Sequence, residues 1–313
     1  MNSEEKGPTP KLHVAVVGSI NVDYLASVDR LPAPGETVAG RESHVVPGGK
    51  GANQAVAAAR MGADVVLIGS VGQDTNASLA LRLLGEAGVD VSGIGAAEGA
   101  TGTAFVTVDS NGENTIVVIP GANAVTGRDV ILAHRDAIAG AGILVVQGEI
   151  PRGGTEAAVA LATGRVILNL APVINVSPET LRAADPLVVN EHEAALVLRQ
   201  LNPSLPIPAD HAKLLSALAD AGPRSVIMTR GSLGAMFTAE GKVESVPAPR
   251  VDVVDTTGAG DAFVGALAAS LAAGNAMRDA VEVASRVGAY SVQRSGTQAS
   301  YPTAADALPE VAR

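Results

Sequence analysis

The stretch Gly51–Val71, GANQAVAAARMGADVVLIGSV, joins two kinds of secondary structure. Its first part, Gly51–Met61, is rich in Ala and has helical spacing. The run stops at Gly62, and glycine there supplies the left-handed cap that commonly ends a helix. Its last part, Val65–Val71, is a short apolar run with many β-branched residues, which is typical of a buried strand. This stretch therefore predicts a helix that leads directly into a strand of a sheet.

The same alternation recurs along much of the chain. Helical stretches end before Gly88 and Gly164, at Ser78–Ala87 and Thr155–Thr163. Further buried strands are predicted at Leu12–Gly18, Ile143–Val146, Val166–Leu170, Leu187–Val189 and Val226–Thr229. Strands that alternate with helices indicate right-handed crossovers and a mostly parallel sheet, so the fold class is α/β.

Two segments break this rhythm. Tyr24–Val46 alternates polar and apolar residues around several Pro and Gly, and Thr103–Ile119 is two alternating runs around the turn Asp109–Gly112. Neither segment forms a stable sheet alone, so one hypothesis is that they pair into a small β lid over the strand ends. The other interpretation is two ordinary surface hairpins. Towards the C-terminus, Ala235–Val251 predicts short antiparallel strands, and long helical patterns follow.

Composition excludes several classes of function. The chain has 313 residues, 47% hydrophobic and 17% charged, which fits two ordinary domains or one large α/β domain. A net charge of −10 and 2% aromatic residues disfavour nucleic-acid binding. Cysteine is absent, which excludes disulfides and thiolate metal sites. No apolar run reaches the ~18 residues of a membrane span, and Met1–Lys11 lacks a signal-peptide core, so neither a membrane helix nor a secretory signal is expected. The absence of cysteine fits a reducing cytoplasm, and a cytoplasmic protein is expected.

The strongest motif is Asp255–Phe263, DTTGAGDAF, in which small residues precede a helical run. Unpaired N–H groups and the positive end of the helix dipole would form an anion hole there. Asp261 in the first turn would then be placed to accept a proton from an attacking hydroxyl. Taken alone, the motif favours a glycine turn with Asp261 as a cap at the helix start. A dinucleotide fingerprint is excluded, because Phe263 stands where its third Gly belongs.

Two further motifs point to a ligand, a polyol or a phosphate at the first and sugar hydroxyls at the second. Pro47–Asn53, PGGKGAN, leads into a helix with Lys50 and Asn53 on one side, and it is not a Walker A loop because Gly follows the Lys. Gly18–Asp23, GSINVD, follows the first strand, and its amide and carboxylate suit sugar hydroxyls. Glu149 also follows a strand. The alternatives are a glycine turn with a solvated Lys and an Asx turn.

The motif NEHE at Asn190–Glu193 follows a strand and opens a helix. Asn190 with Glu193 fits a capping box. The other interpretation is a site for magnesium and phosphate, with oxygen ligands that act through water. The histidines show no zinc-binding spacing, and no nucleophile elbow occurs.

In this order and spacing, the motifs closely resemble the PfkB carbohydrate kinases, the ribokinase family, over about Val14–Pro302. Both family signatures are present, GGKGANQAVAAARMGA at Gly48–Ala63 and DTTGAGDAF at Asp255–Phe263. The motifs most similar to the ribose-specific members are GSINVD, PGET at Pro34–Thr37, GGKGAN, GEN at Gly112–Asn114 and GAN at Gly121–Asn123.

The resemblance implies one ribokinase-like domain over 1–313, a three-layer α/β/α sandwich with a β lid at about 24–47 and 102–119. It implies transfer of a phosphoryl group from ATP to the 5-hydroxyl of D-ribose, with Asp261 as the base and Gly258, Ala259 and Gly260 as the anion hole. The sugar would be held by Asn21, Asp23, Gly49, Lys50, Asn53 and Glu149, with Ala104 and Val118 as lid contacts. The nucleotide would be held by Asn190, Glu193, Thr229, Gly231 and Gly234.

The resemblance also implies Mg²⁺ with ATP, and K⁺ held by Asp255, Thr257, Ser291, Arg294, Gly296 and Ser300. It implies a homodimer through the lid. The chain departs from common family residues at Gly148, Leu170, Ser285 and Arg286. Gly148 bears on the exact sugar, and Ser285 and Arg286 bear on the exact nucleotide. Alternatives within the family are kinases of deoxyribose, fructose or nucleosides. A sugar-binding regulatory protein without catalysis would be expected to lose Asp261 or the anion loop, and both are present.

Overall fold

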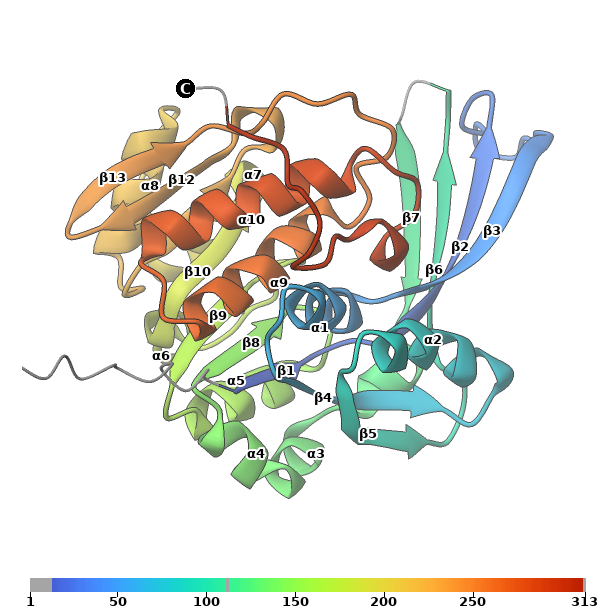
Figure 1. Ribbon diagram of the computed structural model, residues 1–313, viewed down its shortest axis with the longest axis horizontal. Helices are drawn as coiled ribbons and strands as arrows, with labels where there is room; N and C mark the ends of the chain where they lie inside the picture. Colours follow the sequence, from blue (N-terminus) through green and yellow to red (C-terminus); the bar gives the residue numbers. More distant parts are fainter. Residues whose placement is uncertain (1–12, 111–112, 312–313) are drawn as a thin grey trace, which may run out of the picture.

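The computed structural model describes residues 13–110 and 113–311, and Figure 1 shows a large sheet with helices on both faces beside a separate smaller sheet. The segment Met1–Lys11, in which no secretory signal is predicted, and the tip of the Asp109–Gly112 turn lie outside the described residues. The larger sheet has nine strands. In spatial order these are β13 (Lys242–Val246), β12 (Ala235–Ala239), β11 (Val226–Thr229), β10 (Ala184–Asn190), β9 (Arg165–Asn169), β8 (Ile143–Gln147), β1 (Val14–Val17), β4 (Val65–Gly72) and β5 (Asp90–Ala97).

Neighbouring strands pair in parallel from β11 to β5, whereas β12 near one edge pairs antiparallel with both β11 and β13. Strand β1 shows why the fold is layered. Val14 and Val16 belong to the core on one face, Ala15 and Val17 to the core on the other, and all four are buried. A strand covered on both faces needs a continuous apolar run, which is the pattern of Leu12–Gly18.

Helices form the two outer layers. One layer contains α1 (Lys50–Arg60), α2 (Thr75–Glu86), α9 (Ala259–Ala272) and α10 (Met277–Ser291). The other contains α3 (Arg128–Ala133), α4 (Arg135–Gly140), α5 (Arg152–Leu161), α6 (Pro178–Ala183), α7 (Glu191–Leu201) and α8 (His211–Asp220). The three-layer α/β/α class is therefore confirmed. No helix among the described residues is long and apolar enough to cross a membrane.

The smaller sheet confirms that the two irregular segments pair with each other. Its order is β3 (Gly40–Gly48), β2 (Asn21–Val28), β6 (Gly102–Val108) and β7 (Asn114–Ile119), and we call it the lid. The interpretation of both segments as separate surface hairpins is wrong, because β2 and β6 form a parallel pair between them.

The lid also corrects the interpretation of GSINVD as an Asx turn. Asn21 and Asp23 lie inside β2, where they pair with Gly102 and Ala104 of β6. The chain thus leaves β1 and enters the lid within three residues. Strand β5 and the short helices α3, α4 and α6 were not predicted from the sequence. Strand β5 carries no apolar run because it is an edge strand with mostly exposed residues.

Candidate active site

Asp261 lies in the first turn of α9 and is 5% exposed. The helix begins after Gly258, whose φ of 74° is in the left-handed region that glycine tolerates. A Cβ on Gly258 would lie 2.2 Å from Cγ2 of Thr297, so the turn also needs glycine for space. The loop thereby holds the Asp261 carboxylate at a helix N-terminus inside the protein.

The three N–H groups expected to form an anion hole differ in whether they already have a hydrogen-bond partner. The N–H of Ala259 already donates to the carbonyl oxygen of Thr256, at 3.2 Å. Among the described residues, the N–H groups of Gly258, Gly260 and Asp261 have no such partner. The turn that starts the helix consumes the Ala259 donor, and it leaves donors on either side of it for an anion.

Neutral amides surround the Asp261 carboxylate. Asn53 donates through Nδ2 to Oδ2 at 2.9 Å, and Gln54 donates through Nε2 to Oδ1 at 2.9 Å. Gln54 Nε2 also donates to Asn169, and Gln54 Oε1 accepts a hydrogen bond from Gln147. Amides can orient a carboxylate but cannot protonate it, so Asp261 keeps free lone pairs to act as a base.

Gln54, Gln147 and Asn169 were not among the predicted site residues. The available signal was weak. Gln147 and Asn169 are the polar last residues of two buried strands, β8 and β9, and Gln54 lies within the Gly-rich signature. Polar residues at the carboxyl ends of parallel strands gather at one edge of a sheet.

Lys50 and three carboxylates form the charged part of the site. Lys50 Nζ lies 4.0 Å from Asp261 Oδ1, and Asp261 is the main reason that the Lys50 pKa is raised. Burial, followed by the charges of Glu149 and Asp261, raises the pKa of Asp23 to about 7, which Lys50 only partly opposes. Oδ1 of Asp23 is buried without a hydrogen-bond partner among the described residues. A ligand hydroxyl would satisfy it.

The other predicted sugar contacts surround the same place. Glu149 accepts hydrogen bonds from Oγ of Ser19 at 2.5 Å and from the backbone N–H of Lys50 at 3.1 Å. Asn21 is buried and lies two residues before Asp23, on the same face of β2. Cross-strand register places Ala104 beside Asp23 and Val118 beside Ala104, so both lid contacts lie on the Asp23 face of the lid.

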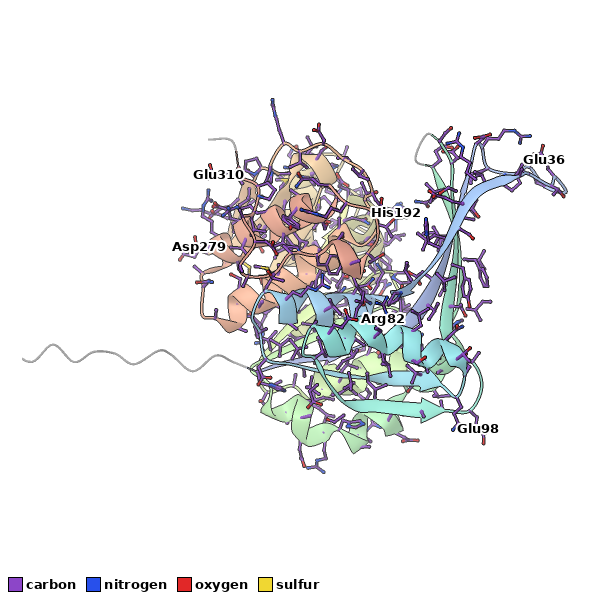
Figure 2. The ribbon with its side chains drawn as sticks, turned by 45° about the vertical axis from the view of Figure 1, so that its right-hand side comes forward. Glu36, Arg82, Glu98, His192, Asp279 and Glu310 are labelled. Carbon is purple, nitrogen blue, oxygen red and sulfur yellow. The ribbon has the colours of Figure 1, made fainter. Side chains whose placement is uncertain are left out.

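The motif NEHE forms the capping box that was one of its two interpretations. The Asn190 side chain accepts from the Glu193 N–H at 2.9 Å, and Glu193 accepts from the Asn190 N–H at 2.8 Å. In Figure 2, His192 of this motif lies on the side of the main body that faces the lid, whereas Glu36 lies near the lid tip. The motif also faces the cavity at Asp261, so capping and ligand binding are compatible.

A cavity of about 160 Å³ brings together the predicted nucleotide and catalytic groups. Thr229 and Asn190 are register partners at the carboxyl ends of β11 and β10. Gly231 and Gly234 lie in the turn after β11 and are not part of the cavity wall. The wall consists of Lys50, Asn169, Ala171, Val188, Val189, Asn190, Glu193, Thr229, Gly258, Gly260, Asp261 and Val264.

The segments predicted to hold a monovalent cation lie side by side. Asp255 accepts hydrogen bonds from the N–H groups of Thr257 and Gly296, at 2.9 and 3.0 Å. Ser291 and Ser300 are buried nearby in sequence, and each donates to a local carbonyl oxygen. Arg294 instead stacks over the ring of Tyr290. No group of three or more His, Cys, Asp or Glu side chains that could hold a metal occurs in residues 13–110 and 113–311.

Comparison with known proteins finds relatives along almost the whole chain. The family described as "pfkB family carbohydrate kinase" matches residues 11–304. A ribokinase of Schizosaccharomyces pombe is 36% identical over 303 residues, covering 93% of this chain and 95% of that protein. Ribokinase of Thermotoga maritima superposes with a TM-score of 0.85 at 32% identity, covering 94% of this chain and 97% of that one.

A further neighbour was solved with ligands. Arabidopsis thaliana ribokinase, complexed with ribose and ATP, superposes with a TM-score of 0.81 at 28% identity. It covers 94% of this chain and 97% of its own. Taken with the family match over nearly the whole length, these likenesses show that this chain belongs to the pfkB family of carbohydrate kinases.

Proposed function

We propose that this protein is an ATP-dependent ribose kinase that transfers the γ-phosphoryl group to the 5-hydroxyl of D-ribose and yields D-ribose 5-phosphate and ADP. The observation that carries the proposal is the position of Asp261, a buried carboxylate beside unpaired helix N–H groups. The relatives named as ribokinases, which match along almost their whole length, support the same sugar.

In the reaction, the 5-hydroxyl of ribose donates its proton to Asp261 while its oxygen attacks the γ-phosphorus of ATP. The bond from that phosphorus to the bridging oxygen breaks, and ADP carries away the electron pair. The N–H groups of Gly258 and Gly260 stabilise the charge on the transferring group. Lys50, 4.0 Å from Asp261, adds a positive charge at the same place. Asn53 and Gln54 keep the base oriented.

The sugar is proposed to lie between the lid and the main sheet. Asn21, Asp23 and Glu149 bind its hydroxyls, and Gly49 lets the backbone approach, because a Cβ there would lie 2.7 Å from the Asn21 nitrogen. Ala104 and Val118 cover it from the lid. The closed lid excludes water, which would otherwise compete with ribose for ATP. We place the lid within one domain that spans the chain.

The metal ions are proposed from the chemistry of the donors. A divalent cation, Mg²⁺, supplies charge neutralisation on the phosphates. Asn190 and Glu193 line the cavity, and burial raises the pKa of Glu193, although the Asn190 N–H and the charge of Lys50 partly oppose this. Oxygen donors of this kind fit Mg²⁺ bound through water. K⁺ would be held by Asp255 and the carbonyl oxygens of the loops that Asp255 joins.

The lid is also proposed to join two copies of the chain. Its outer strand β7 is exposed at every residue, and Val117 is 56% exposed. The aromatic ring of Phe105, in register with Val117, is exposed beside it. An apolar sheet edge of this kind is typical of a contact surface. Analytical ultracentrifugation tests the homodimer, and a monomer at micromolar concentration would contradict it.

The function is tested by a coupled assay of ADP release with Mg²⁺ and ATP. D-ribose, 2-deoxy-D-ribose, D-fructose and adenosine are compared as acceptors, each with K⁺ and with Na⁺. We expect ribose to give the highest kcat/KM, and the product to be identified as the 5-phosphate by NMR. Turnover on another acceptor with none on ribose would reassign the protein within its family.

A further inference from the structure

The GAN motif at Gly121–Asn123 has no role in the reaction described above. Asn123 lies in the short helix η1 (Gly121–Val125), directly after the lid strand β7, and it is 2% exposed. Its side chain reaches across 103 positions of sequence to the backbone of Ile20, the residue before β2. Asn123 thus lies at the foot of the lid, where β2 and β7 both join the main body.

The hydrogen bonds of Asn123 determine which end of its amide points where. Its Oδ1 accepts from the N–H of Ile20 at 2.8 Å, and its Nδ2 donates to the carbonyl oxygen of Ile20 at 3.2 Å. A backbone N–H can only donate and a carbonyl can only accept. The reverse orientation would therefore place the Asn123 amino group against the Ile20 N–H and the Asn123 oxygen against the Ile20 carbonyl oxygen. The orientation of the Asn123 amide is therefore imposed by the main chain.

That orientation passes to the proposed sugar ligand Asn21. The second hydrogen of Asn123 Nδ2 is donated to Oδ1 of Asn21, at 2.7 Å. The atom of Asn21 that faces Asn123 must then be its oxygen, since its amino group would meet another donor. Asn21 Nδ2 makes no hydrogen bond to the other described residues, so Asn21 is left with N–H donors to offer.

Glycines lie close to this pair of residues. Gly102 is the register partner of Asn21 on β6, and a Cβ at Gly102 would lie 2.2 Å from both Nδ2 of Asn123 and Oδ1 of Asn21. On the other side, a Cβ at Gly49 would lie 2.7 Å from the backbone nitrogen of Asn21. Gly102 thus makes space for the contact between the two amides, and Gly49 makes space for the backbone of Asn21.

We propose that Asn123 is a positioning residue for sugar specificity: it locks the Asn21 carboxamide so that Nδ2 faces the sugar as a hydrogen-bond donor. The inference rests on the proposed function, because it assumes that Asn21 contacts the acceptor. Asn21 then donates a hydrogen bond to a sugar oxygen, whereas ionised Asp23 on the same strand face accepts a hydrogen bond from a sugar hydroxyl. Two adjacent ligands of opposite polarity require a sugar that presents both.

The test is Asn123→Asp, which keeps the size of the side chain and replaces the two donor hydrogens by an acceptor oxygen. That oxygen faces Oδ1 of Asn21, so we expect the Asn21 amide to rotate and offer its oxygen to the sugar. Calorimetry with D-ribose should show a Kd at least ten-fold weaker, and kcat at saturating ribose should change less than three-fold. Asn275→Asp is the control, because Asn275 also uses Nδ2 to donate to a side chain, Ser270, away from the site.

A series of monodeoxy riboses separates positioning from general damage. The wild-type protein should bind one deoxy analogue at least five-fold more weakly than ribose because that analogue lacks the oxygen that Asn21 reads. Asn123→Asp should lose this discrimination and keep the others. Asn123→Ser, which retains a single donor, should retain part of it, and it serves as the second variant if the Asp variant does not fold.

Each outcome decides a separate point. Equal weakening of ribose and all analogues in Asn123→Asp, or unchanged ribose affinity, would overturn the positioning role. A wild-type protein that binds and phosphorylates a different acceptor, and not ribose, would instead reject the proposed substrate. The specificity test would then be repeated with the deoxy analogues of that acceptor.

Discussion

The affinity for ribose should depend on pH through Asp23. Burial together with the charges of Glu149 and Asp261 raises the pKa of Asp23 from 3.8 to about 7, and Lys50 does not offset them. The unpartnered Oδ1 of Asp23 accepts a sugar hydroxyl best when the carboxyl is ionised. Ribose therefore binds the ionised form. At a pH below the pKa of Asp23, the free protein must lose the Asp23 proton before it binds ribose.

The size of the effect follows from the fraction ionised. With a pKa of about 7, roughly one tenth of Asp23 is ionised at pH 6 and roughly nine tenths at pH 8. Provided that the sugar-bound carboxyl stays ionised throughout, Kd should be about ten-fold weaker at pH 6 than at pH 8, equivalent to ~1.4 kcal/mol. Proton release on binding, measured by calorimetry in buffers of different ionisation enthalpy, should be largest near pH 6.

Two variants check the cause. Asp23→Asn should weaken ribose binding and remove its pH dependence between 6 and 8. Asp261→Asn removes one of the charges that raise the Asp23 pKa, so the midpoint should move to lower pH. A wild-type Kd that is constant from pH 6 to 8, or that is tighter at pH 6, would refute the reasoning, because tighter binding at low pH means that the protonated acid donates to the sugar.

Three further predictions concern catalysis and stability. Asp261→Asn should lower kcat by about 10²–10⁴-fold with Kd for ribose little changed, and near-normal turnover in a single-turnover assay would reject it as the base. Gly258→Ala should lower Tm and destabilise the fold by about 1–3 kcal/mol, because φ is 74° and the new Cβ meets Thr297. Gly260→Ala is the control, since its Cβ meets nothing within 4 Å. Equal Tm values for the two variants would contradict this prediction. Because the folded protein holds the Asp23 proton more tightly than the unfolded chain, the contribution of Asp23 to the free energy of unfolding should fall as pH rises from 3.8 to about 7. Denaturant titrations at several pH values should therefore give a different dependence of the unfolding free energy on pH for wild type and for Asp23→Asn. The same dependence in both proteins would argue against the raised pKa.

Much of the fold could be predicted from local patterns. Strands such as Val65–Val71 are apolar on both faces because helices cover them, and helices such as Gly51–Met61 end at glycine. Edge strand β5 could not be predicted, since its residues are mostly exposed and carry no apolar run. The start of the lid was misplaced, because Asn21 and Asp23 are as compatible with a turn as with a strand until β6 pairs with them.

The candidate site shows the same division. The sequence alone determined that Asp261 would follow a glycine turn at a helix start, and that polar motifs would end several parallel strands, because turn chemistry and strand patterns act over a few residues. Only the tertiary structure decided that Gln54 would hold Asp261 from 207 positions away, and that Asn123 would orient Asn21 from 102 positions away. These contacts depend on the order of the strands and on how the lid is seated, and both follow from the packing of the whole chain.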